Sequence, residues 1–127
     1  MNWAVVGAIG VGGAFGAILR FKIRDFSEWL LGEQFLYGTL IANVLGCFIA
    51  GFLINYWQNA QVSLTLKEGI MIGFLGALTT FSSFSLETLY LLQQQVWLKA
   101  GGNILGNLVL CLLFVFVGAW LGGRMSG

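Results

Sequence analysis

Four long apolar runs, separated by short polar links, dominate the pattern of this sequence. They cover about residues 3–21, 35–57, 69–92 and 98–122, and each is close to the roughly 20 residues that an α-helix needs to cross a bilayer. Because the links are short, consecutive spans are expected to be antiparallel neighbours. The pattern predicts an all-α integral membrane protein with a single four-helix transmembrane domain over residues 1–127.

The link between the first two runs has a pattern of its own. It reads KIRDFSEWLLGEQ over residues 22–34 and holds five of the eleven charged side chains. Phe26, Trp29 and Leu30 recur in it at helical spacing. We therefore expect a short separate helix over about residues 24–33, lying at the membrane surface with Trp29 at the level of the headgroups.

Composition supports the membrane interpretation and excludes other classes. Only 9% of the residues are charged and 58% are hydrophobic, whereas a soluble domain is about 25% charged. Six Lys and Arg against five Asp and Glu leave no basic face for nucleic acid. The chain has no His, and Cys47 and Cys111 lie inside apolar runs, where we interpret them as small core residues rather than a disulfide or metal ligands.

The positive charges give no preferred orientation. The links after the first and third spans hold Lys22, Arg24 and Lys99, and the opposite side holds Lys67, Arg124 and the N-terminal amine. Cytoplasmic loops are normally enriched in Lys and Arg. The balance therefore indicates either a weak orientation signal or a chain that inserts both ways up.

Small residues recur four positions apart in every span. Such stripes let helix backbones approach closely in lipid. Four short helices cannot bury all of these stripes among themselves, so we expect a homo-oligomer. The spaced residues are Gly12 and Gly16; Gly38, Ala42, Gly46 and Ala50; Gly69, Gly73 and Ala77; Gly102 and Gly106; and Gly118 and Gly122.

The third span is unusual because residues 76–85 contain five hydroxyl side chains in ten positions. Hydroxyl and β-branched residues beside glycine weaken a helix. One interpretation is an ordinary helix whose hydroxyls bond to their own carbonyls. The other is a helix broken at mid-membrane, with the carbonyls near Gly76 to Thr80 turned toward a small cation or a partner chain.

Two phenylalanines and three serines follow this segment and suggest an ion path. Phe81 and Phe84 fall on one helical face, with Ser82, Ser83 and Ser85 on its flanks. Phenylalanines in a span commonly face lipid or core. Alternatively, the partly positive ring edges can face an anion, and the serine hydroxyls can donate hydrogen bonds to it.

Polar side chains in the other spans allow two interpretations each. Thr39 and Asn43 share a stripe in the second span, and Asn107 lies in the fourth. They serve either as interhelical links or as donors along a path. Arg20 is either an interface anchor or a cation in an anion-attracting vestibule, and Glu87 could form an ion pair or cap a helix.

Nothing in the chain forms a catalytic constellation, because it lacks His, a Cys beside a base, and a carboxylate pair at adjacent helical positions. We therefore do not expect an enzyme.

Three motifs carry a resemblance to a known family. They are Gly16-x-x-x-Arg20-Phe21; Gly38-Thr39-Leu40-x-x-Asn43-x-x-Gly46; and Gly73-Phe74-Leu75-Gly76-x-Leu78-Thr79-Thr80-Phe81-Ser82-x-Phe84-Ser85-x-Glu87. In this order and over nearly the whole chain, they resemble the Fluc (CrcB) family of fluoride channels.

The resemblance implies an antiparallel, dual-topology homodimer in the inner (plasma) membrane of a prokaryote. Such a dimer has two pores and exports cytoplasmic fluoride passively, which gives fluoride resistance. It also implies a structural sodium ion at the dimer interface, held by carbonyls at Gly76 and Thr79.

The resemblance further implies roles for single residues of the path. Those assigned to the pore are Phe81, Phe84, Asn43, Ser82, Ser83, Ser85, Thr39 and, in the least conforming span, Asn107; Arg20 and Glu87 are assigned to the vestibule.

Two other functions stay open. A small dual-topology multidrug exporter needs a membrane-embedded carboxylate, usually in the first span, and residues 3–21 contain none. A non-transporting membrane assembly subunit would move no ion when purified alone.

Overall fold

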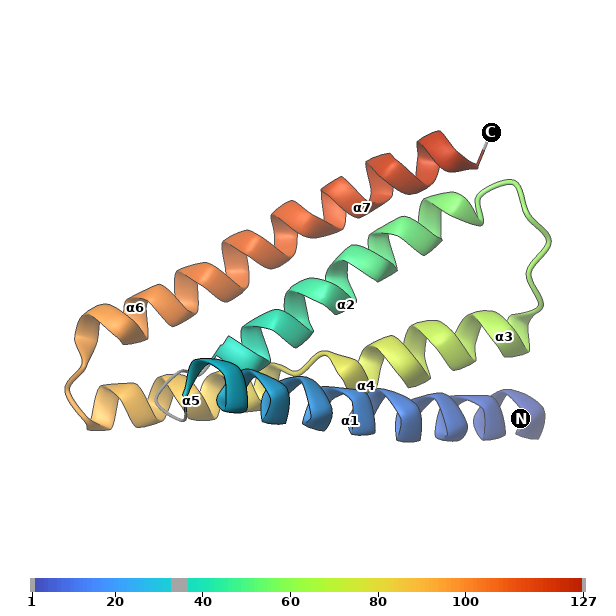
Figure 1. The fold of residues 1–127 in the computed structure, drawn as a ribbon. Helices are drawn as coiled ribbons and strands as arrows, with labels where there is room; N and C mark the ends of the chain where they lie inside the picture. The colour runs from blue at the N-terminus through green and yellow to red at the C-terminus, as the bar shows by residue number, and fades with distance from the viewer. Residues whose placement is uncertain (1, 33–36, 127) are drawn as a thin grey trace.

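The computed structural model describes residues 2–32 and 37–126, which are almost entirely helical. Within these ranges, four helical segments are long and apolar enough to cross a membrane, which confirms the predicted number of spans (Figure 1). The first two segments are α1 (Trp3–Leu31) and α2 (Tyr37–Tyr56). The third comprises α3 (Leu64–Glu68), η1 (Gly69–Leu75), α4 (Gly76–Leu78) and α5 (Phe81–Gln93), and the fourth comprises α6 (Trp97–Leu105), η2 (Gly106–Leu110) and α7 (Cys111–Met125).

The first helix is longer than its apolar run. We expected the span to end near residue 21 and a separate helix to follow over 24–33, but α1 continues without a break to Leu31. No Gly or Pro interrupts residues 17–31, and an ion pair between Arg24 and Glu28, one turn apart, supports the helix here. The helix stops at Gly32, whose positive φ of 91° favours glycine. Residue 33 lies outside the described residues.

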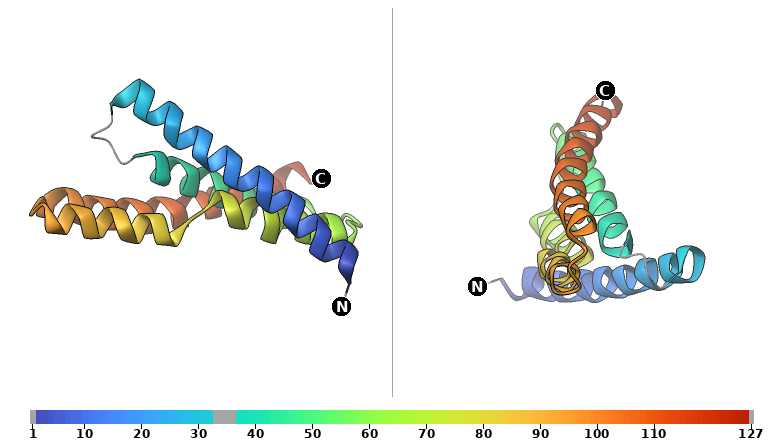
Figure 2. Two further views of the ribbon diagram at one scale, coloured as in Figure 1. Left: turned by 90° about the horizontal axis from the view of Figure 1, so that it is seen from below. Right: turned by 90° about the vertical axis from the view of Figure 1, so that its left-hand side faces the viewer.

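The spans pack as two parallel pairs. Figure 1 shows α2 and α7 side by side and running the same way, while α1 lies along the first half of the third span. Figure 2 shows α1 crossing this span diagonally. Glycines make both contacts close: a methyl group on Gly16 would collide with the carbonyl oxygen of Phe74, and one on Gly118 with that of Phe48. The predicted small-residue contacts are therefore present inside a single chain.

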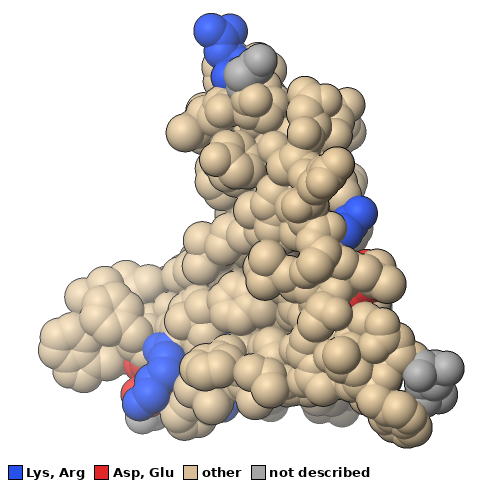
Figure 3. Space-filling model, turned by 90° about the vertical axis from the view of Figure 1, so that its right-hand side faces the viewer, with Lys and Arg blue, Asp and Glu red and all other residues tan. Residues whose placement is uncertain are grey.

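The outer surface is apolar. The buried core is small, centred on Ala42, Leu75 and Leu78, whereas Phe116 is 72% exposed and Leu98 is 90% exposed. Figure 3 shows a face with only a few separated charged side chains. Such a surface suits lipid or a second protein rather than water.

The third span is interrupted between α4 and α5. Thr79 (φ −88°, ψ 153°) and Thr80 (φ −151°, ψ 124°) are extended. The side chain of Thr80 caps the next helix by accepting a hydrogen bond from the Ser83 amide at 3.1 Å. The helix thus breaks within the expected segment, although its depth in a membrane stays a prediction.

Candidate functional site

The break is held by a side chain from another helix. Asn43 of α2 accepts a hydrogen bond from the Thr80 amide at 2.7 Å and donates one to the Thr80 carbonyl at 3.1 Å. In an unbroken helix the Thr80 amide would donate to the Gly76 carbonyl. Asn43 therefore replaces a helical bond and leaves the Gly76 carbonyl without its usual donor.

A chain of amides extends this contact into the fourth span. Asn43 also donates to the Asn107 side chain at 2.9 Å, and Asn107 donates to the carbonyl and to the side chain of Asn103. Asn103 in turn donates to the Thr88 hydroxyl at 3.0 Å, and Thr88 donates to the Phe84 carbonyl. Asn43 and Asn107 are thus interhelical links in this structure, and both N–H bonds of the Asn43 amide are used.

The two candidate phenylalanines lie just beyond the break and form an edge-to-face pair. Their ring centroids are 5.3 Å apart and the ring planes meet at 75°. Phe84 is buried, but Phe81 is 72% exposed. One chain therefore surrounds only one of the two rings, and the other is open to an external surface.

The candidate hydroxyls are not equivalent. Ser82 and Thr80 share a hydrogen bond of 3.2 Å, whereas Ser83 accepts one from Arg20 at 3.3 Å. Ser85 donates its only hydroxyl proton to the Phe81 carbonyl at 2.9 Å. Of the three serines, Ser85 therefore has the least capacity to donate to an anion.

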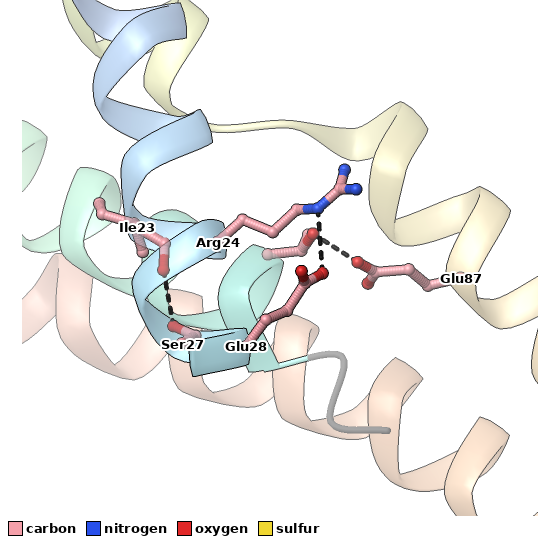
Figure 4. Close-up of polar contacts among 6 residues, drawn as sticks. Ile23, Arg24, Ser27, Glu28 and Glu87 are labelled. Atoms are coloured by element: carbon pink, nitrogen blue, oxygen red, sulfur yellow. Dashed lines mark hydrogen bonds and ion pairs between the residues drawn. The ribbon is translucent and has the colours of Figure 1, made fainter. Parts of the chain in front are cut away.

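A polar pocket of about 190 Å³ lies on the side of α5 that faces α1 and α2. It is lined by Ala17, Arg20, Phe21, Arg24, Thr39 and Ser83. Thr39 donates to Glu87 at 2.5 Å, and Figure 4 shows Arg24 and Glu87 extending toward each other from α1 and α5. The pocket therefore gathers two cations and two hydroxyls where three helices meet, and the Glu87 carboxylate binds one of these hydroxyls.

Two polar atoms beside this pocket have no partner within the described part of the chain. They are Arg20 Nε and Glu87 Oε2, and both are buried. Because buried polar groups are normally paired, this donor and this acceptor are suited to water or an ion. Arg20 is therefore more than an exposed anchor, since its guanidinium contacts Ser83 and lines the pocket.

Several site features were not predicted from the sequence. Thr88 completes the amide chain, and Arg24 lines the pocket. The π-helical segments η1 and η2 were also missed, and η2 contains the buried Asn107. Wide π-helical turns often mark functional positions, but they arise from packing and have no composition signal. The helical position of Arg24, one turn after Arg20, could have indicated its role.

Taken together, the fold and the site define a multi-pass, all-helical membrane protein with a polar cluster between its spans. The sequence profile described as CrcB-like protein, Camphor Resistance (CrcB), matches residues 7–119. The chain belongs to this family.

Curated relatives of the chain share most or all of its length. One from a Nitratiruptor species is 45% identical over 127 residues, covering 100% of this chain and 98% of the relative. One from Shewanella loihica is 46% identical over 113 residues (89% and 91%), and one from Dehalococcoides mccartyi is 46% identical over 119 residues (93% and 92%). All three relatives are named "Fluoride-specific ion channel FluC".

Proposed function

We propose that this protein is a fluoride-specific ion channel that exports fluoride passively and so gives fluoride resistance. The observation that carries the proposal is the 45% identity, over the full 127 residues, to a relative named as such a channel. The relatives' names describe channels rather than enzymes, in keeping with the lack of a catalytic constellation.

The path we propose runs from the pocket to the phenylalanine pair. Fluoride is small and strongly hydrated, so closely spaced donors must replace its water. Arg20 would attract the anion into the pocket. Ser82, Ser83 and the ring edges of Phe81 and Phe84 would then supply positive or donating groups without a full charge that would trap the ion.

Asn43 needs a conditional role in this path. Its two N–H bonds already serve the Thr80 carbonyl and Asn107, so it can donate to fluoride only by giving up one of them. Loss of the Asn107 contact leaves in place the two hydrogen bonds between Asn43 and Thr80, which we call the clasp of Asn43 on Thr80. Asn107 would then act by releasing Asn43 rather than by binding fluoride itself.

We further propose that two copies assemble as an antiparallel homodimer in the inner membrane of a prokaryote. The balanced Lys and Arg count permits both orientations. The 72% exposure of Phe81 supports a second copy, because a ring that lines a narrow path must be enclosed. Each pore would then use the open ring of one chain and the outer face of its partner.

The helix break fits a sodium ion at that interface. Sodium prefers oxygen ligands, and channel proteins bind such cations with rings of backbone carbonyls. The Gly76 carbonyl lacks its usual donor because Asn43 binds the Thr80 amide, and Thr79 is extended. Gly76 is exposed and Thr79 half-buried in one chain, so two carbonyls from each copy could hold the ion.

Passive export is sufficient for the biological task. Fluoride enters cells as neutral HF, ionises at cytoplasmic pH and cannot cross the bilayer as an anion. In an inside-negative cell the potential drives anions outward by about 2.3 kcal/mol per charge per 100 mV. A selective pore therefore needs no coupled energy source.

The test is fluoride efflux from liposomes that contain only the purified protein, followed with a fluoride electrode and with chloride as the competing anion. We expect rapid fluoride loss without chloride permeation. Fluoride retention by demonstrably folded protein would overturn the proposal and favour the drug exporter or the assembly subunit.

Replacing a pore ring tests the path itself. Phe81→Ile is expected to slow fluoride efflux by about tenfold, since about 1.4 kcal/mol on a barrier is one factor of ten in rate. Phe116→Ile is the matched control, because Phe116 is equally exposed at 72% but lies in α7. Equal efflux from the two variants would remove Phe81 from the path.

A further inference from the structure

The contact between α2 and α7 follows one regular register. Three contacts start from residues of α2 that are eight and then four positions apart, and each joins two residues that are 64 positions apart in the sequence. Asn43 bonds Asn107 at 2.9 Å, and the Asn55 side chain bonds the Ala119 carbonyl at 2.9 Å. Between them, a methyl group on Gly51 would collide with the carbonyl of Val115. Each such residue of α2 therefore faces the residue of α7 or η2 that follows it by this fixed separation.

Two cysteines occupy the missing position in this series. Cys47 lies one turn after Asn43 and Cys111 one turn after Asn107, so the register makes them partners. Their side chains lie close enough to interact with each other. Both thiols are free and half-buried. Tight packing at Gly51, one turn further on, holds the two backbones close beside the pair.

The surroundings of the pair restrict its chemistry. The chain has no His, and no cluster of three or more Cys, Asp or Glu occurs in residues 2–32 and 37–126. The pair therefore offers two sulfur ligands in an apolar setting without a third or fourth donor. This excludes a tetrahedral structural zinc site, which takes four protein ligands.

We propose that Cys47 and Cys111 form a two-coordinate site for a soft divalent cation, with mercuric ion as the probe. Thiolate sulfur is the ligand that soft metals select. Two thiols and Hg²⁺ give an S–Hg–S bridge and release two protons to the solvent. The product carries no net charge, so its burial among apolar helices avoids the large cost of burying an ion. A monovalent soft ion would leave one negative charge in the same place.

The bridge is tested on the full-length purified protein with mercuric chloride, by intact mass and by counting the thiols that remain reactive. We expect one mercury per single chain and simultaneous loss of both thiols. The concentration of a competing monothiol that removes the bound ion should be at least about 100-fold higher for the unsubstituted protein than for Cys47→Ser or Cys111→Ser. The reason is that the second sulfur binds the ion intramolecularly. Zinc chloride in place of mercury should give no retained metal.

Three results would overturn the site. They are two mercury ions bound to one chain, a mercury bridge between two chains, or equal release of mercury from the unsubstituted protein and the single-cysteine variants. The stoichiometry on the unsubstituted chain decides the matter even if a serine variant does not fold.

Discussion

At the scale of single residues, Asn43 links three parts of the molecule. Its amide satisfies both backbone groups of Thr80 and also binds Asn107. A helix break leaves backbone groups unpaired, and such groups are costly in lipid. One side chain of α2 therefore stabilises the extended segment of the third span, and a change at this position affects the backbone that carries the candidate site.

Removing this amide is expected to destabilise the fold. Asn43→Ala removes the hydrogen-bond partner of the Thr80 amide and of the Asn107 side-chain oxygen, and a buried unpaired group costs about 1–3 kcal/mol. Asn55→Ala is the matched control, because it removes a single hydrogen bond on the same helix, worth about 0.6 kcal/mol in a membrane protein. Unfolding by SDS in mixed micelles measures both losses, and equal losses would contradict the clasp.

At the scale of helices, the sequence predicts those features that depend on the residue types within a single segment. The four spans follow from apolar length, because lipid contact requires apolar side chains along each helix. The run of hydroxyls from Thr79 to Ser85 indicated either an ordinary helix or a break near Gly76 to Thr80, since these residues weaken a helix, and the structure has the break. The end of α1 was missed because charges and Trp29 indicated the membrane surface, while the absence of Gly and Pro let the helix continue.

The remaining features depend on contacts between helices, which a single sequence does not encode locally. The clasp of Asn43 on Thr80 requires the position of α2 against the third span. The pairing of Cys47 with Cys111 likewise requires the register of α2 on α7. Each of these residues was singled out, but only their chain neighbours were known, so their partners could not be assigned.

The space around two glycines predicts that substitution by alanine destabilises the fold at one of them and stabilises it at the other. Gly118→Ala is expected to destabilise the fold by about 1–3 kcal/mol, as overpacking does, because the added methyl group would meet the Phe48 carbonyl. At Gly10 nothing lies within 4 Å of an added methyl group, so Gly10→Ala should stabilise α1 by up to about 1 kcal/mol. The same SDS unfolding assay measures both, and a shift of the same sign in both would contradict the packing.

At the scale of the whole molecule, the links that join successive spans lie at two opposite ends of the helix bundle. The link after α5 lies at one end and the link between α2 and α3 at the other (Figure 1). Positive charge is balanced between these ends, which is the condition for insertion in both orientations. A small excess of positive charge at one end should therefore suffice to fix the orientation of the chain, and it would show whether the assembly needs both orientations.

Fixing the orientation tests the antiparallel dimer. Gln93→Lys with Gln94→Lys adds charge at one end, and Asn59→Lys with Gln61→Lys adds it at the other. We expect either variant alone to lose dimers in size-exclusion chromatography and fluoride efflux, and coexpression of both to restore them. The unsubstituted chain is the control. Full dimerisation of each variant alone would contradict the antiparallel arrangement.

The pairing of α2 with α7 has a consequence for how the protein is made. Asn43 and its partner Asn107 are 64 residues apart, so at about 5–20 residues per second the ribosome finishes the second several seconds after the first. During this interval α2 has entered the membrane with an amide that lacks its final contact. Biogenesis must therefore hold the early spans near the site of insertion until the last one arrives, and a chain stopped before η2 should be a preferred substrate for membrane quality-control proteases.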